Sequence, residues 1–239
     1  MSPFVAGALR VIRAMNELLP SLIRSSVFGT IVLLALLFIP AGTLRYWQGW
    51  AFVIVASLVS TAYTVYLAKH DPALLKRRTE AGISHEQEPA QKVIVFFLFA
   101  AFIAIIVLPP LDVRFGWSRL PWYVSVIGNA LVAFSFYLFY LVSKVNTYAA
   151  ANVRVEAGQK VIDTGMYGWV RHPMYLAALF LLVGTPLALG SWWTLLLLPL
   201  FLLILYFRIA NEEKVLLRDL RGYAEYRQRV RHRLVPGVW

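Results

Sequence analysis

The sequence predicts an all-α, polytopic integral membrane protein with about six transmembrane segments, the last two forming a helical hairpin, and a C-terminal amphipathic helix. Of its 239 residues, 60% are hydrophobic, and the mean hydropathy is +0.67, far above the usage of globular proteins. The charged residues separate long runs that contain no charge. Each run is near the roughly 20 residues that a membrane-spanning helix needs.

Four charge-free runs predict four transmembrane helices within residues 25–143. The first run could also be a secretory signal peptide, but no small-residue cleavage site closes it and further spans follow, so we expect an uncleaved anchor. The preceding residues 1–24 are mildly amphipathic and are expected to lie at the membrane interface. The four runs are Ser25–Leu44, Tyr46–Ala68, Val93–Leu111 and Leu120–Ser143.

The fifth run, Pro173–Phe207, is too long for one upright span. As a single helix it would measure about 52 Å, against a hydrocarbon core of roughly 30 Å. Gly184, Pro186 and Gly190 interrupt it, so we predict a tight hairpin of two spans. Because a hairpin returns to the side on which it began, the polar residues at its two ends are expected to meet at one membrane face.

The segment 208–233 has the periodicity of an amphipathic helix, since apolar residues recur there at spacings of three and four. We expect this helix to be interrupted at Gly222 and to lie against the membrane or over the site. No linker separates two domains, so residues 1–239 are predicted to form a single membrane domain. Within it, residues 144–239 would carry the cofactor-binding and catalytic region.

Lys and Arg residues are distributed very unevenly over this topology. Of the 23 in the chain, only Arg45, Arg114 and Arg119 lie on one side, in the loops Gly42–Trp50 and Asp112–Pro121. The positive-inside rule therefore places both termini in the cytoplasm. We interpret the net charge of +11 as attraction to anionic membrane lipids rather than nucleic-acid binding. The absence of cysteine excludes disulfides, thiolate nucleophiles and Cys-based metal sites.

Polar residues stand at both ends of the predicted hairpin. Pro173 suits the first turn of a helix, which places Arg171 and His172 at the helix entrance, where the dipole and free N–H groups favour carboxylates and phosphates. Taken alone, the pair could equally be a topology anchor and an interfacial cap. At the other end, the adjacent carboxylates Glu212 and Glu213 are costly near lipid and require partners.

The spacing of the charges suggests how these carboxylates are used. Arg208 precedes Glu212 by four residues, so the two can pair on one helix face. Glu213 then points about 100° away and is free to face His172 or a ligand such as an ammonium group or ribose hydroxyls. Asn146, after the fourth span, is a candidate for the same cavity. The sequence contains neither a Gly-rich phosphate loop nor His and carboxylate residues at metal-ligand spacing, so we expect no metal.

Together these motifs resemble the isoprenylcysteine carboxyl methyltransferase family, which is akin to the membrane phospholipid methyltransferases. The resemblance covers about residues 145–239, and the first three spans carry little of it. Its elements are Gly165-x-Tyr167-x-x-Val170-Arg171-His172-Pro173-x-Tyr175, Arg208-x-x-x-Glu212-Glu213-x-x-Leu216, Gly222-Tyr223-x-x-Tyr226 and Arg233-Leu-Val-Pro236.

The resemblance implies S-adenosylmethionine as methyl donor, bound at the cytoplasmic face of a bacterial inner membrane between the hairpin and the tail. It implies a lipophilic acceptor: a prenylcysteine-like carboxylate, a small carboxylate or thiol, or a phospholipid. Where eukaryotic members carry a His shortly after the Asn-aromatic step, this chain has Tyr148, so the acceptor site is expected to differ. Carried over residue by residue, the resemblance assigns cofactor binding to Gly165, Tyr167, His172, Pro173, Tyr175, Glu212 and Glu213, acceptor binding to Arg171 and Asn146, and catalysis to Arg171 and Glu213.

Two alternatives remain open on the sequence. A sterol-type membrane reductase also has a helix-entrance His and a tyrosine-rich tail, but it uses NADPH. The adjacent Glu212 and Glu213 favour a sulfonium ligand, because two carboxylates are poor neighbours for a ribose phosphate. A non-catalytic transport or scaffold protein is the second alternative, although transporters often show internal repeats and mid-membrane charges, and neither occurs here.

Overall fold

The computed structural model describes residues 3–79, 86, 88–149, 152–153, 155–156 and 158–239, with the backbone alone for residues 3–19 and 21. All regular secondary structure in these residues is helical. The elements are α1 (Pro3–Ala41), α2 (Trp47–His70), α3 (Pro72–Thr79), α4 (Pro89–Phe115), α5 (Trp122–Val145), η2 (Gly165–Gly168), α6 (Pro173–Ala188), η3 (Trp193–Leu197), α7 (Leu198–Asp219) and α8 (Tyr223–Arg229).

Five described helices are long and apolar enough to cross a membrane. The prediction of about six transmembrane segments is not confirmed at the first arm of the hairpin, which is shorter than these five. This arm, α6, has 16 residues and is about 24 Å long, because Gly190 adopts a left-handed φ of +82° directly after it. The five spans are Leu22–Ala41, Trp47–His70, Pro89–Phe115, Trp122–Val145 and Trp193–Asp219.

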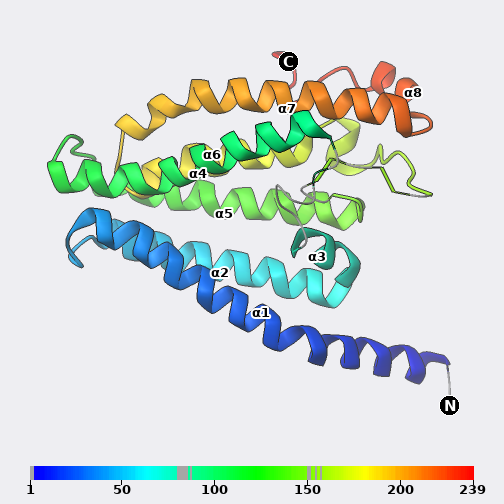
Figure 1. The fold of residues 1–239 in the computed structure, drawn as a ribbon, viewed down its shortest axis with the longest axis horizontal. Helices are drawn as coiled ribbons and strands as arrows, with labels where there is room; N and C mark the ends of the chain where they lie inside the picture. Colours follow the sequence, from blue (N-terminus) through cyan, green and yellow to red (C-terminus); the bar gives the residue numbers. More distant parts are fainter. Residues whose placement is uncertain (1–2, 80–85, 87, 150–151, 154, 157) are drawn as a thin grey trace.

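The long helices run roughly along one direction, with α1 and α2 on one side of the bundle and α7 on the other (Figure 1). One end of the bundle, called the near end here, holds α3, the start of α6 and α8; the opposite, far end holds the turns after α1, α4 and α6. The near end therefore also contains the loops rich in Lys and Arg. Residues 3–24, predicted as a separate interfacial segment, continue into the first span as one helix, α1.

The packing of α6 differs from that of a simple hairpin, since α6 lies mainly along α5 while α7 packs on α4. Glycines permit the close approach of α5 and α6. A Cβ on Gly128 would stand 2.1 Å from the backbone nitrogen of Ala188, and one on Gly184 would stand 2.9 Å from the carbonyl oxygen of Gly128. Small residues commonly serve such membrane-helix contacts. The rigid α5–α6 pair fixes the start of α6 beside the end of α5.

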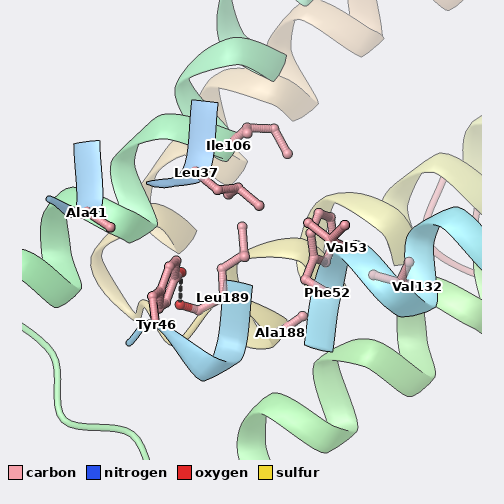
Figure 2. Packing of buried hydrophobic residues seen from close by; sticks show 9 residues of the cluster. All are labelled: Leu37, Ala41, Tyr46, Phe52, Val53, Ile106, Val132, Ala188 and Leu189. Atoms are coloured by element: carbon pink, nitrogen blue, oxygen red, sulfur yellow. Dashed lines mark hydrogen bonds between the residues drawn. The ribbon is translucent and has the colours of Figure 1, made fainter. Parts of the chain in front are cut away.

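The far end is closed by polar contacts around an apolar cluster. Within this cluster the Tyr46 hydroxyl donates to the carbonyl of Leu189, joining the α1–α2 turn to the end of α6 (Figure 2). Asp112, predicted in a loop, lies instead in the last turn of α4 and is 1% exposed. Its carboxylate accepts hydrogen bonds from Ser118 and from the Ser191 hydroxyl. These bonds fix the turn after α6, which the interrupted run predicted only as a bend.

Candidate functional site

The entrance to α6 is held by the C-terminal tail, residues 230–239. The backbone N–H of Arg171 donates to the carbonyl of His232 at 3.0 Å, and that of His172 donates to the carbonyl of Arg233 at 2.9 Å. Pro173 begins α6, as predicted. The tail therefore uses backbone donors that the sequence suggested would be free for an anionic ligand.

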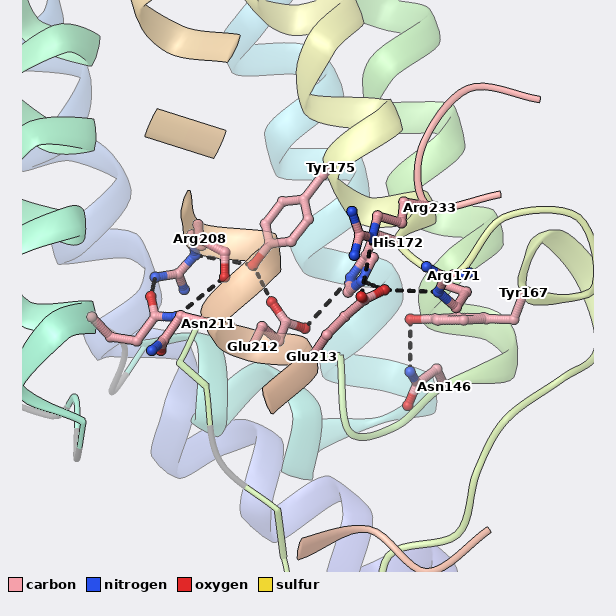
Figure 3. A network of polar contacts seen from close by, with 11 residues as sticks. Asn146, Tyr167, Arg171, His172, Tyr175, Arg208, Asn211, Glu212, Glu213 and Arg233 are labelled. Atoms are coloured by element: carbon pink, nitrogen blue, oxygen red, sulfur yellow. Dashed lines mark hydrogen bonds and ion pairs between the residues drawn. The ribbon is translucent and has the colours of Figure 1, made fainter. Parts of the chain in front are cut away.

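Glu213 is buried, and the side chains of Arg171, His172 and Arg233 surround its carboxylate (Figure 3). Its Oε1 accepts from Arg171 Nε at 2.7 Å and lies 3.3 Å from His172 Nε2, while Oε2 accepts from Arg233 Nε at 3.0 Å. The residue is 3% exposed. The expectation that Glu213 faces His172 is confirmed, but the expectation that its carboxylate stays free is wrong, because three side chains already surround it.

Arg171, like Glu213, is held by several hydrogen bonds. Besides its contact with Glu213, its Nη1 donates to the carbonyls of Val230 and Arg231, each at 2.7 Å. The guanidinium thus ties α7 to the tail. Carbonyls and a carboxylate together satisfy most of the donors that Arg offers in its fixed fork.

Glu212, by contrast, faces a cavity and remains partly exposed. Its Oε1 lies 3.7 Å from His172 Nδ1, and its Oε2 accepts from the Tyr175 hydroxyl at 2.5 Å. The same hydroxyl accepts from Arg208 Nε at 3.0 Å. Tyr175 therefore joins Arg208 and Glu212, for which the spacing of four predicted that the two can pair on one helix face. His172 and Tyr175 orient the Glu212 carboxylate at the cavity wall.

A second polar group behind Arg208 was not predicted. Gln91 is fully buried; its Oε1 accepts from Arg208 Nη1 at 2.7 Å, and its Nε2 donates to Asn211 Oδ1 at 2.8 Å. Glu86 Oε1 accepts from Arg208 at 3.3 Å, and its Oε2 accepts from the N–H of Val153 at 3.2 Å. The position of Gln91, a polar residue just before an apolar span, could have indicated that it belongs to the site. The loop sequence around Glu86 contains no comparable indication.

Asn146 and Tyr167 form the opposite wall. Asn146 Nδ2 donates to the Tyr167 hydroxyl at 2.7 Å, and Asn146 Oδ1 accepts from the N–H of Tyr148 at 2.9 Å. The Tyr226 hydroxyl of α8 donates to the carbonyl of Tyr167 at 2.8 Å. Burial raises the pKa of Tyr167, so its phenol is neutral at physiological pH. The wall therefore offers aromatic surface and neutral hydrogen-bonding groups.

The cavity has a volume of about 480 Å³, within the roughly 300–1,000 Å³ typical of small-molecule sites. It is lined by the Glu212 carboxylate and by apolar side chains that include Leu98 of α4 and Phe139 of α5. Seven predicted site residues line it: Asn146, Tyr167, Arg171, His172, Pro173, Tyr175 and Glu212.

The other two predicted residues, Gly165 and Glu213, are not among the residues described as lining the cavity. Gly165 has a left-handed φ of +58° at the start of η2, a conformation that a side chain disfavours. Gly165 contributes to the site by forming the turn that positions Tyr167.

The segment 208–233 is interrupted at Gly222, as predicted, and the interruption divides it into two helices. Helix α7 ends at Asp219, Gly222 has a φ of +87°, and α8 begins at Tyr223. The apolar residues of this region pack on Val155 and Val161, and Tyr223 and Tyr226 line the cavity. This part of the chain thus covers the site.

Comparison with known proteins gives two matches. The phospholipid methyltransferase family matches residues 123–222. The protein-S-isoprenylcysteine O-methyltransferase of Saccharomyces cerevisiae (strain ATCC 204508 / S288c) is 27% identical over 191 residues, which cover 75% of this chain and 76% of the yeast protein. The family match includes the cavity-lining residues from Phe139 to Leu220.

Proposed function

We infer from these two matches, which bear out the resemblance to isoprenylcysteine carboxyl methyltransferases, and from the apolar helices that the protein is an integral membrane methyltransferase. From this premise we propose that the protein transfers a methyl group from S-adenosylmethionine to a lipophilic acceptor at the cytoplasmic face of a bacterial inner membrane. The observation that carries the proposal is the cavity, which joins an oriented carboxylate, Glu212, to an apolar region between membrane helices.

Glu212 is the residue suited to hold the methyl donor. S-adenosylmethionine supplies an electrophilic methyl group on a cationic sulfonium, and it also carries an ammonium group and ribose hydroxyls. A partly exposed carboxylate held by His172 and Tyr175 fits either the ammonium or the hydroxyls. Tyr148 and Tyr167 provide aromatic surface for the adenine base. We assign Glu213 and Arg171 to positioning these walls, in place of direct donor and acceptor contacts.

The apolar lining of the cavity suits an acceptor that comes from the lipid phase. Val95 and Leu98 of α4 and Phe139 of α5 contribute to it, while α4 and α5 make few contacts with each other among the described residues. An acyl or prenyl chain could therefore enter between these helices. Its reactive head would meet the donor held by Glu212.

The arrangement fits methyl transfer because this reaction depends mainly on positioning. A nucleophile must approach the methyl carbon in line with the bond that breaks, in a site from which water is excluded. The buried ion pairs and the helices α7 and α8 supply a rigid, covered cavity. For a carboxylate acceptor no general base is needed, because the nucleophilic oxygen is already deprotonated, and we propose a carboxyl O-methyltransferase.

Calorimetry on the detergent-solubilised protein tests this function. We expect wild type to bind S-adenosylmethionine, and Glu212→Gln to bind it at least about tenfold more weakly, since a charge-assisted contact contributes about 1.5–3 kcal/mol. Glu225→Gln, at an exposed site on α8, is the matched control and should bind like wild type. Binding of NADPH without S-adenosylmethionine would overturn the proposal in favour of the reductase.

Product analysis then identifies the chemistry. Incubation with S-adenosylmethionine labelled in its methyl group and a membrane lipid extract should yield a labelled lipid-soluble product. Release of the label by mild base identifies a methyl ester. A base-stable product would reject carboxyl methylation and direct attention to thiol or amine acceptors.

A further inference from the structure

Arg78, at the end of α3, is a cation placed behind the cavity wall. Its Nε donates to the carbonyl of Ala149 at 3.1 Å, and its Nη2 contacts Ser143 Oγ and Met174 Sδ, both at 3.4 Å. Ala149 and Met174 line the cavity. The guanidinium also lies over the ring of Tyr63, at 5.3 Å from the ring centre. Arg78 is thus fixed next to the cavity from the side of Asn146 and Tyr167.

Within the described part of the chain, no carboxylate contacts Arg78. The comparable arginines all have one: Arg77 binds Glu156 through Nε and Nη2 at 2.8 Å, Arg171 binds Glu213, and Arg208 contacts Glu86. Burial lowers the pKa of the Arg78 guanidinium, an effect that nearby Tyr63 and Tyr167 oppose. Arg stays charged in proteins, so a positive charge that meets no carboxylate among the described residues stands beside the cavity.

One of the groups that Arg78 contacts on the cavity side, the Met174 sulfur, is a weak partner. A thioether sulfur is a poor acceptor, and Met side chains rearrange easily around ligands. The Nη1 group of Arg78 donates to none of the described residues. An oxyanion in the cavity that displaced the Met174 sulfur would gain a forked, charge-assisted contact.

We propose that Arg78 recognises the anionic head of the methyl acceptor and so determines acceptor specificity. This assignment rests on the proposed methyl transfer, and it gives Arg78 the acceptor-binding role that the sequence gave to Arg171. Glu212, which lines the cavity, would then match the cationic donor, and Arg78, next to the cavity, would match the anionic acceptor. A carboxylate and a lipid phosphodiester share the chemistry that Arg78 would bind.

For a carboxylate acceptor, the reaction balances without a proton transfer. A carboxylate oxygen lone pair forms the new O–CH₃ bond as the C–S bond of the sulfonium breaks, and sulfur keeps the electron pair to become a neutral thioether. Arg78 would orient the carboxylate by one oxygen and leave the other to react. In this role Arg78 is a binding residue and withdraws no proton.

The experiment measures, by calorimetry without methyl donor, how tightly each protein binds N-acetyl-S-farnesylcysteine and its neutral carboxamide. Wild type should prefer the acid over the amide by about tenfold or more. Arg78→Gln should lose that preference, and Arg78→Lys, which keeps the charge without the fork, should retain part of it. Arg221→Gln, an exposed arginine near α8, controls for the loss of one positive charge.

The acid-to-amide ratio does not depend on how much of a variant is folded, so an unstable Arg78→Gln still gives an answer, and Arg78→Lys gives a second one. Equal binding of acid and amide by wild type, or an unchanged ratio in Arg78→Gln, would overturn the assignment. Phosphatidylethanolamine, tested in vesicles, separates the two oxyanions. If wild type binds this lipid more tightly than the farnesylcysteine acid, and Arg78→Gln loses that binding, the anion site is supported and its ligand is a phosphate.

Methyl transfer is measured separately with labelled S-adenosylmethionine. A wild type that prefers the acid but methylates nothing contradicts the proposed function and leaves the anion site standing. If wild type methylates a lipid but the acid-to-amide ratio is unchanged in Arg78→Gln, the proposed function stands and the assignment of Arg78 is contradicted. In the expected outcome, Arg78→Gln raises the KM for the acid about tenfold while the affinity for S-adenosylmethionine stays within about twofold.

Discussion

Replacing Glu213 by Gln removes one negative charge from a point where three cationic or protonatable side chains meet. Arg171, Arg233 and His172 lie 2.7, 3.0 and 3.3 Å from its carboxylate oxygens. Gln has nearly the same shape and keeps one acceptor oxygen, so the change isolates the charge. The Arg171 guanidinium would then be buried beside an amide, with no other carboxylate among its described contacts.

The expected cost follows from this burial. Arg171 and Glu213 are each 4% exposed at the side chain, and removing one partner of a buried ion pair costs about 3–5 kcal/mol. For a chain of this size, each kcal/mol lowers the unfolding midpoint by about 2–4 °C. Glu213→Gln should therefore lower it by about 6–20 °C. Glu225→Gln, at an exposed site, should change it by less than about 2 °C.

Thermal unfolding in detergent, followed by the fluorescence of the eight Trp residues, measures this shift, and calorimetry with S-adenosylmethionine accompanies it below the transition. We expect a large loss of stability with donor affinity within about threefold of wild type, since Glu213 lies behind the cavity wall. The reasoning fails if the midpoint is unchanged while donor affinity falls about tenfold or more. That result would make Glu213 a direct ligand of the donor.

Two further predictions concern the packing and the orientation of the site. Gly128→Ala should lower stability by about 1–3 kcal/mol or more, because its Cβ would meet the backbone of Ala188; Gly29→Ala, which meets nothing within 4 Å, should be neutral or slightly stabilising in the same thermal assay. Tyr175→Phe removes the hydroxyl that joins Arg208 and Glu212, so stability should fall by about 1–2 kcal/mol. It should also weaken S-adenosylmethionine binding, and an unchanged affinity would show that Glu212 needs no orientation from Tyr175.

The meeting of the two polar motifs could be predicted because it depends on local rules. Pro173 marks the first turn of a helix, and a charge-free run of limited length forces the chain back to the same side. These two facts alone bring His172 beside Glu212 and Glu213. The length of α6 could not be predicted in the same way, because its end depends on the tertiary contacts of Gly128 and Asp112 as well as on its own glycines.

The partners of the charges were harder to predict. Sequence spacing showed that Arg208 and Glu212 can share a helix face, but a hydroxyl from α6 stands between them. Similarly, Glu86 lies in a loop without periodicity, and the sequence gives no sign that it reaches Arg208. Arg78 belonged to a group of basic residues interpreted together as lipid anchors. Only the fold shows that Arg77 has a carboxylate partner and that its neighbour contacts none among the described residues.

The docking of α3 against residues 143–156 makes the cavity a composite of two separate stretches of chain. The stretch that matches the phospholipid methyltransferase family, residues 123–222, supplies Asn146, Tyr167 and Glu212. Neither Glu86 nor any residue of α3 belongs to it. Substitutions in α3 or at Glu86 can therefore change the surroundings of the cavity while Asn146, Tyr167 and Glu212 keep their identity. In such an architecture, the choice of acceptor can diverge between relatives that retain the same methyl donor.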